Sequence, residues 1–258
     1  MRLTVAYDGT DFCGWQKQQQ QRSVQGELEA TIASLAGHPV ALCVASRTDA
    51  GVHALGNVAA FETTRDIDPQ GWLRGLNAEG PKDIAVTEVQ ACSADYNPRF
   101  DTLGKRYRYL LDLSPVPHPL WRRLAWRPRV SVARFDLGQV QEAAQTLVGT
   151  HDFAAFRNSA DTRTNTIRTI TDIKIIPRFA SEPMLVAVEI EGTAFLHHMV
   201  RIMIGTLIQV GKGRLSVPQV GALLQPTAFR ADAGVTAPAH GLCLLKVMLG
   251  RQTGQRDP

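Results

Sequence analysis

The chain has 258 residues, of which 44% are hydrophobic and 20% are charged, as in folded globular proteins rather than disordered ones. No stretch reaches the ~20 consecutive apolar residues that a membrane-spanning helix needs. The first residues, MRLTVAYDGT, alternate like a strand and do not form the apolar core of a signal peptide. We therefore expect a cytoplasmic protein that does not enter membranes, with enough residues for one large domain or two smaller ones.

The net charge of +4 is unevenly distributed along the chain. Residues 1–95 hold 7 Lys and Arg against 12 Asp and Glu, whereas residues 96–258 hold 21 against 12. The basic residues are densest between Tyr96 and Val130, where tyrosines and tryptophans lie among them. A run of charge is usually a solvated face, but a basic face with aromatic residues is also typical of a groove for nucleic acid.

The cysteines are scattered and argue against a metal or disulfide framework. There are four of them and no C-x-x-C pair: Cys13, Cys43, Cys92 and Cys243. This spacing fits neither a zinc site nor a small disulfide-bonded fold, so we expect buried free thiols.

The first part of the chain alternates between strand and helix patterns. A strand with Leu3, Val5 and Tyr7 on one face precedes a helix that Ser23 caps and Gly37 ends. Two strands follow, in VALCVAS and NVAAFETT, then a helix from Pro69 and a strand in DIAVTEV. This β-α-β-β-α-β order predicts a ferredoxin-like unit over residues 1–103.

The second part repeats this pattern without repeating the sequence, and predicts a second α+β unit over residues 104–249. Its expected strands are KRYRYLLDL, TIRTITDIKII, MLVAVEIEG and GLCLLKVML. Its expected helices are an amphipathic one with Leu137, Val140, Ala144 and Leu147 on one face, the apolar FLHHMVRIMIGTLIQVG, and a short one near Pro218. The tail, residues 250–258, is expected to be disordered.

Residues 46–56, SRTDAGVHALG, form a connection between two strands that is too long for a minimal hairpin. Arg47, Asp49 and His53 lie around Gly51, and small residues let a ligand approach the backbone closely. On its own this pattern is weak, because an aspartate in a turn usually caps the turn.

Two further segments combine charge with apolar residues. In KRYRY, Tyr107 and Tyr109 share one face of a strand with basic residues beside them, which fits either a basic edge strand or an RNA surface. In FLHHMVRIMIG, Arg201 lies among apolar residues of a helix, so it needs a partner and a carboxylate is predicted. His197 and His198 are adjacent and would point apart on a helix, which argues against a metal pair.

Segments from near residue 6 to near residue 245 resemble the TruA family of tRNA pseudouridine synthases, in the order that the family shows. The most specific of them is SRTDAGVHALGNVAAF. The others are AYDGTDFCGWQKQ, SVQGELE, LRGLNAEGPKDIAV, RYRYLL, THDFAAFR, TIRTI, FLHHMVRIMIGTLIQVGKG and APAHGLCL.

The resemblance implies roles for four residues. Asp49 resembles the catalytic aspartate, and Arg47 the arginine associated with turning the target base out of the RNA. Tyr107 matches the tyrosine that stacks on the target uracil, and Arg201 the basic residue that pairs with the aspartate. The candidate residues for binding the substrate are Tyr107, Arg47, His53, Arg99, Arg106 and Arg108.

The resemblance also implies the fold, the activity and the partners. It implies two ferredoxin-like (RRM-like) α+β units with mainly antiparallel sheets, joined around a central basic active-site cleft. It implies a homodimer that isomerises uridine to pseudouridine at positions 38, 39 and 40 of the tRNA anticodon stem-loop, with no cofactor and no metal. Where the family commonly has a His-Ala-Arg-Phe run, this chain has Asn97 and Pro98 before Arg99 and Phe100. Arg99 is retained, but the resemblance does not extend to the details of this loop.

Two other functions remain open at this point. One is a non-catalytic ferredoxin-like RNA-binding protein, although KRYRYLLD lacks the glycines and the later aromatic residue of an RNP1 strand. The other is hydrolytic removal of a base, which would release free uracil. Whether Asp49 attacks C6 or C1′, or acts through a glycal, is also open, as are the choice of tRNAs and the geometry of the dimer.

Overall fold

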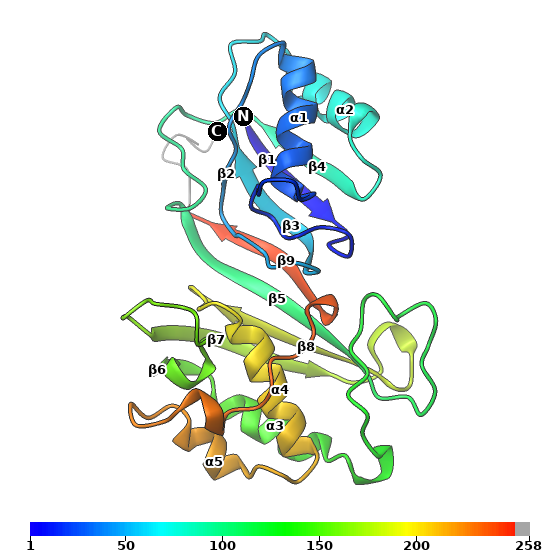
Figure 1. The fold of residues 1–258 in the computed structure, drawn as a ribbon, viewed down its shortest axis with the longest axis vertical. Coiled ribbons are helices and arrows are strands. Elements are labelled where there is room, and N and C mark those ends of the chain that lie inside the picture. The colour runs from blue at the N-terminus through cyan, green and yellow to red at the C-terminus, as the bar shows by residue number, and fades with distance from the viewer. Residues whose placement is uncertain (251–258) are drawn as a thin grey trace, which may run out of the picture. The chain divides into compact units, whose positions relative to one another are not determined.

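The structure is a computed structural model that describes residues 1–250, and its chain divides into two units (Figure 1). The first unit comprises Met1–Lys105 and the chain from Cys243 onward, and the second comprises Arg106–Leu242. Both combine helices with mainly antiparallel strands, so the predicted α+β class is confirmed. From residue 251 on, the predicted disordered tail lies outside the described residues. No helix of the described chain is both long and apolar enough to cross a membrane.

The first unit is built on β1, whose side chains alternate between exposed and buried as the sequence predicts. Leu3, Val5 and Tyr7 are buried, and β1 runs antiparallel to β3 on one side and to β4 on the other. The strands of this unit are β1 (Arg2–Tyr7), β2 (Cys43–Val44), β3 (His53–Ala60), β4 (Ile84–Gln90) and β9 (Leu242–Leu249).

The last strand belongs with the first unit, which differs from the predicted second unit of 104–249. β9 runs parallel to β3, with His53 opposite Cys243 and Ala54 opposite Leu244. The order of elements along the chain does not show such a pairing, because the two strands are far apart in sequence.

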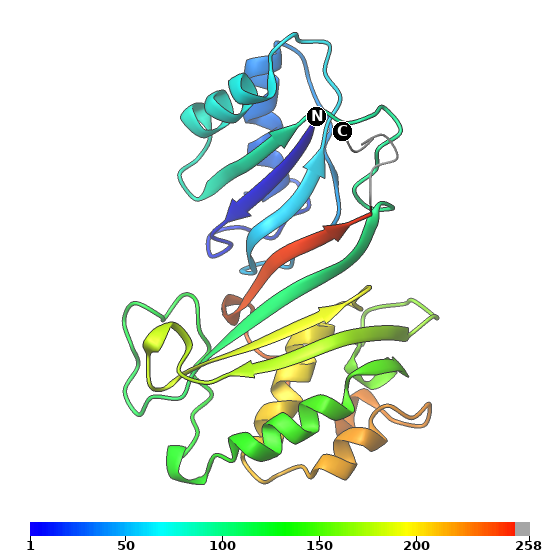
Figure 2. The same cartoon turned by 180° about the vertical axis from the view of Figure 1, so that it is seen from behind.

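Two helices cover one face of the strands of the first unit, and Figure 2 shows the other face. They are α1 (Val24–Ala36) and α2 (Pro69–Glu79). Ser23 caps α1 by accepting from Gly26 N, and Gly37 ends it in the left-handed conformation, as predicted. The buried face of α1 includes Val24, Leu28 and Ile32. Since these apolar residues recur at helical spacing, burying them against the strands sets the orientation of α1.

The second unit has strands in the order β5-β8-β7-β6. Their bounds are β5 (Thr102–Asp112), β6 (Gly149–Asp152), β7 (Ile167–Ile176) and β8 (Leu185–Gly192). Strands β7 and β8 are antiparallel, with Ile173 opposite Ile190. The short β6 was not predicted, because its residues GTHD are polar and show no alternation.

Three helices complete the second unit: α3 (Leu137–Thr146), α4 (Met199–Gly211) and α5 (Val217–Ala222). α4 lies across one face of β7 and β8 (Figures 1 and 2) and also packs against α3. The predicted helix began at Phe195, but α4 begins at Met199, because His198 adopts a left-handed conformation with φ 61°. Short 3-10 turns lie at Val132–Arg134, Ala154–Phe156, Phe179–Ser181, Arg230–Asp232 and Ala239–Gly241.

The cysteines are free, as predicted, but they are not buried. Cys43 is exposed, and Cys13, Cys92 and Cys243 are half-buried. The prediction of burial rested on a tendency of the residue type, which these four positions do not follow.

Candidate active site

The connection between β2 and β3 in the first unit carries Asp49. Asp49 is half-buried, and Arg47, two residues earlier, is exposed. The segment therefore carries a half-buried carboxylate and an exposed guanidinium two residues apart.

The backbone on both sides of Asp49 is fixed by the segment Asp8–Trp15. Trp15 N donates to Thr48 O at 3.0 Å, and Gly14 forms a β-bridge with Asp49 itself. Gly51 N donates to Phe12 O at 3.4 Å. Because these bonds involve main-chain atoms, the position of Asp49 is set independently of its own side chain.

Two glycines allow the segments to lie this close. A Cβ on Gly9 would overlap the Val52 carbonyl oxygen, and a Cβ on Gly14 would lie 2.7 Å from Thr48 O. Gly14 also has φ +114°, a conformation that other residues rarely adopt. Sequence reasoning included DGTDFCGW in the family resemblance but gave it no role; the paired glycines were the signal that could have suggested one.

A buried polar network stabilises the connection between β2 and β3. Tyr7 and Thr48 are linked through their hydroxyl oxygens at 2.8 Å, and Asn57 Nδ2 donates to Ser46 O at 2.9 Å. Asn57 is fully buried. Buried polar groups are costly unless they are paired, so this network favours a single conformation of the connection.

His53 lies in the same scaffold. It is buried, with 5% exposure, and its Nδ1 accepts from Gly9 N at 3.1 Å. The structure therefore places this imidazole inside the first unit, against the segment that holds the Asp49 connection.

In the second unit, Tyr107 and Tyr109 lie on β5 and point to the same face, as their alternation predicts. Tyr107 is 8% exposed, and its ring packs edge-on against Phe195 with centroids 5.2 Å apart. The Tyr109 hydroxyl donates to Pro238 O at 2.7 Å, and burial raises the pKa of this phenol well above its usual range. Tyr107 is thus slightly exposed, whereas Tyr109 is fully buried.

The two arginines of β5 form ion pairs with β8. Arg106 Nε donates to Glu191 Oε2 at 2.8 Å, and Arg108 Nη2 to Glu189 Oε1 at 2.7 Å. The hydrogen bond that Arg106 donates to Glu191 raises the pKa of Arg106 further. The sequence showed the arginines but not these partners, which are more than 80 residues away.

Arg99 and Lys105 occupy the end of the first unit. Arg99 is exposed on a turn in which Asn97 Oδ1 accepts from Arg99 N at 3.0 Å, so Asn97 and Pro98 form an ordinary turn. Burial, followed by the charge of Arg99, lowers the pKa of Lys105 to about 8. Sequence reasoning treated Lys105 only as one more basic residue of the strand.

Arg201 lies on α4 and is held by a segment that we call the strap, residues 234–238. Its Nε donates to Ala237 O at 2.7 Å, and Ala237 N donates to Arg201 O at 3.1 Å. Within the second unit, this bond to a backbone carbonyl fixes the direction of the Arg201 side chain. The carboxylate partner expected from the sequence stays a prediction.

The strap itself rests on α4 through glycines. Gly234 N donates to Thr206 Oγ1 at 2.9 Å, and a Cβ on Gly205 would overlap the Val235 carbonyl oxygen. Backbone meets backbone here, so the strap can reach Arg201 only while position 205 has no side chain.

We expect Gly205→Ala to lower the free energy of unfolding by about 1–3 kcal/mol, because the new methyl group overpacks this contact. Gly221→Ala is the matched control in α5, since a Cβ there meets nothing within 4 Å. It should leave stability unchanged or raise it by ~0.5–1 kcal/mol. Urea unfolding of the full chain measures both, and equal stabilities would show that the strap does not need Gly205.

His197 and His198 do not point apart, so the argument from helical geometry was wrong. Both precede α4, and their ring centroids are 4.0 Å apart. Asn158 Nδ2 lies 2.6 Å from His198 Nδ1, and His197 N donates to Asp161 Oδ2 at 3.2 Å. The left-handed backbone at His198 is the physical reason, and nothing in the sequence pattern marks it.

Comparisons with known proteins agree with the resemblance. A family model described as tRNA pseudouridine synthase matches residues 3–101 and 143–248. These stretches include Asp49 and Arg201, whereas Tyr107 lies between them. Relatives named tRNA pseudouridine synthase A occur in Geobacter sp. (strain M21), 41% identical over 96% of this chain and 97% of that protein, and in Syntrophotalea carbinolica, 41% identical over 98% and 97%.

The chain therefore belongs to the tRNA pseudouridine synthase A family, which confirms the predicted family. A structural comparison aligns this protein with a chain in the crystal structure of a Cbf5-Nop10-Gar1 complex. The alignment covers 94% of this chain and 57% of that chain. The two chains are 11% identical, with a TM-score of 0.38.

Proposed function

We propose that this protein isomerises uridine to pseudouridine at positions 38, 39 and 40 of the tRNA anticodon stem-loop, with Asp49 as its nucleophile. Its class, a tRNA pseudouridine synthase and thus an isomerase, follows from its family. The observation that supports Asp49 is the rigid connection on which it lies, held by main-chain bonds from Asp8–Trp15. No second carboxylate occurs in SRTDAGVHALG.

The reaction explains why a carboxylate is the required group. The bond from N1 to C1′ breaks, and the uracil turns while it is held. A bond from C5 to C1′ then forms as C5 loses its hydrogen as a proton and N1 takes up a proton, so that the product is an isomer of the substrate. Nothing is oxidised or reduced, so the chemistry requires neither a redox cofactor nor a metal. It does require a nucleophile that forms a covalent intermediate, and a carboxylate can do so.

We assign to Arg201 the task of keeping Asp49 ionised during the reaction. An opposite charge within ~4–6 Å lowers the pKa of a carboxylate by 1–3 units, and the family resemblance implies such a pair. What supports this role in the structure is the strap, because the bond from Arg201 Nε to Ala237 O at 2.7 Å orients the guanidinium. Attack at C6, attack at C1′ and a glycal route all use the same two residues.

Tyr107 and Arg47 would act on the flipped nucleotide. A uridine in a stacked stem exposes neither C1′ nor C6, so the base must leave the stack at a cost of a few kcal/mol. Stacking of the flipped base on Tyr107 offsets roughly 1–3 kcal/mol of this cost. The Tyr107 ring already packs edge-on against Phe195. Arg47 is exposed beside the Asp49 connection, which suits a group that fills the vacated position.

The remaining candidates would hold the RNA backbone or the scaffold. Arg99 is exposed, and the guanidinium groups of Arg106 and Arg108 each carry five N–H donors, of which their glutamates use only some. Such contacts position RNA without reading its sequence. For His53, burial against Gly9 favours support of the Asp49 connection over contact with RNA.

We further propose that the protein consists of two ferredoxin-like units joined around a basic cleft. We also propose that it forms a homodimer and is located in the cytoplasm. The order β4-β1-β3 with β2 on β3 supports the first unit, and the family resemblance supports the rest. The competing function, a non-catalytic RNA-binding protein, gives no reason for the rigid Asp49 connection.

The positions can be tested with anticodon stem-loops that carry uridine at 38, 39 or 40 alone, and cytidine at the other two. Each should yield pseudouridine on nucleoside analysis by mass spectrometry, and a stem-loop with cytidine at all three should yield none. Pseudouridine at other positions would refute the assignment of the substrate without affecting the family.

A further inference from the structure

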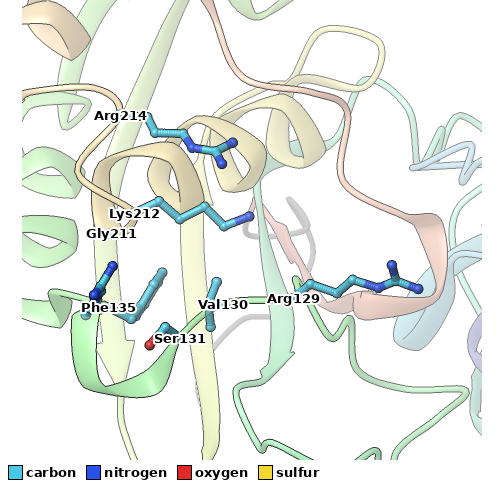
Figure 3. Close-up of a pocket in the computed structure, with 8 residues that line it drawn as sticks. Arg129, Val130, Ser131, Phe135, Gly211, Lys212 and Arg214 are labelled. Atoms are coloured by element: carbon cyan, nitrogen blue, oxygen red, sulfur yellow. The ribbon is translucent and has the colours of Figure 1, made fainter.

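A second basic site lies at the far end of α4 from Arg201, within the second unit. It is a cavity of about 190 Å³, and Arg129, Arg134, Lys212 and Arg214 line it. None of these four residues was assigned a role above. Figure 3 shows Lys212 between Arg214 and the segment of Val130 and Ser131.

The cavity is a built feature rather than a gap between loops. Asp136 N donates to Gly211 O at 3.0 Å. The Phe135 ring packs so closely against Gly211 that a Cβ at position 211 would overlap it. Gly213, with φ +67°, turns the chain at the end of α4, and Arg214 N donates to Gln209 O at 2.9 Å. These bonds bring cations from two separate segments to one place.

The positive charge of the cavity is not neutralised. Among residues 1–250, no carboxylate pairs with any of these four side chains, and no carboxylate lines the cavity. Asp136, which is adjacent in sequence, caps α3 by accepting from Gln139 N at 3.0 Å. Burial, followed by the charge of Arg214, lowers the pKa of Lys212, as expected where positive charge is in excess.

The dipole of α4 does not explain four cations. The C-terminus of a helix carries about half of a negative elementary charge, which favours one basic residue in the last turn. Arg129 and Arg134 belong to a different segment, so a positive charge of about 3.5 remains after the dipole is counted. A bound anion would compensate it.

The size and the residue types indicate which anion fits. Pockets for drug-sized ligands measure roughly 300–1,000 Å³, so a cavity of about 190 Å³ is too small for a whole nucleotide. It suits a single phosphate group, and arginine is the preferred partner of phosphate because its donors match two oxygens at once.

We propose that this cavity binds one phosphate of the tRNA backbone, remote from the nucleotide that reacts. This rests on the proposed function, which supplies the RNA. Eleven residues of helix at 1.5 Å each place Lys212 about 17 Å from Arg201. At ~3.4 Å per stacked nucleotide, that corresponds to roughly five nucleotides, so the cavity anchors a different part of the same RNA.

The test compares Lys212→Ala/Arg214→Ala with Arg122→Ala/Arg178→Ala in the full chain. The control removes the same charge from two exposed arginines of the second unit. Loss of one phosphate contact should flatten the slope of log affinity against log salt by ~0.7–0.9, which is roughly a fivefold weaker Kd for tRNA at about 0.15 M salt. The control should change the slope less, and kcat at saturating tRNA should be unchanged in both.

Three results would overturn the proposal: an unchanged slope, equal effects of the two double variants, or loss of a thermal shift by inorganic phosphate without any change in tRNA affinity. The third would assign the cavity to free phosphate. Lys212→Arg/Arg214→Lys keeps both charges and should bind tRNA like the wild type. Absence of pseudouridine formation by the wild type would refute the proposed function instead, and would leave these binding results intact.

Discussion

Asp49→Asn is expected to abolish pseudouridine formation while tRNA still binds. The amide has the size and shape of the carboxylate, and main-chain bonds with Trp15 and Phe12 hold the position. An amide cannot form the covalent intermediate, and no other carboxylate lies in residues 46–56 to replace it. Binding should stay within about twofold or tighten, because one negative charge near phosphate is removed.

Nucleoside analysis under single-turnover conditions measures the product, and filter binding measures the Kd. Asp66→Asn is the matched control, since Asp66 is an exposed residue of the same unit and the charge change is the same. The control should turn over like the wild type. Measurable product from Asp49→Asn would mean that Asp49 is not the nucleophile.

Arg201→Ala is expected to lower both kcat and stability. Removing one charged group that acts in the transition state costs about 10²–10³ in kcat. The carbonyl of Ala237 would also lose its donor, and a buried acceptor left unsatisfied costs ~1–3 kcal/mol of folding free energy. The double variant Asp49→Asn/Arg201→Ala should remain inactive.

The control for Arg201→Ala is Arg178→Ala, which removes an exposed arginine of the same unit. Rates at saturating tRNA and urea unfolding of the same preparations separate the two effects. If Arg201→Ala lowered stability but left kcat unchanged, Arg201 would only hold the strap and would have no part in the reaction.

Much of the local structure could be predicted from the sequence, because the signals were local. The alternation of Leu3, Val5 and Tyr7 predicted β1, and Ser23 with Gly37 predicted both ends of α1. The periodicity of these segments follows from burying one face, which the residues themselves encode.

The features that were missed depend on contacts between distant residues or on single backbone angles. The pairing of β9 with β3 joins Cys243 to His53. The partners of Arg106 and Arg108 are on β8, and the left-handed His198 shortens α4. None of these has a periodic signature, because each depends either on how separate elements pack or on one backbone angle.

The candidate site was predicted mainly through the family resemblance. Residues 46–56 alone left Asp49 indistinguishable from a turn cap. The scaffold of Asp8–Trp15 and the strap of 234–238 had no role assigned from sequence, although both hold proposed site residues. Their glycines matter because backbone must approach backbone, and spacing along the chain does not show that.

Tritium release from tRNA labelled at C5 of uracil tests the central claim most directly. Forming the bond from C5 to C1′ must expel the C5 hydrogen, so the wild-type protein should release tritium in proportion to the pseudouridine that it forms, with no free uracil. Tight tRNA binding without tritium release would instead indicate a non-catalytic RNA-binding protein. Free uracil with labelled C5 would indicate hydrolytic removal of the base, and either result would contradict an isomerase that uses Asp49.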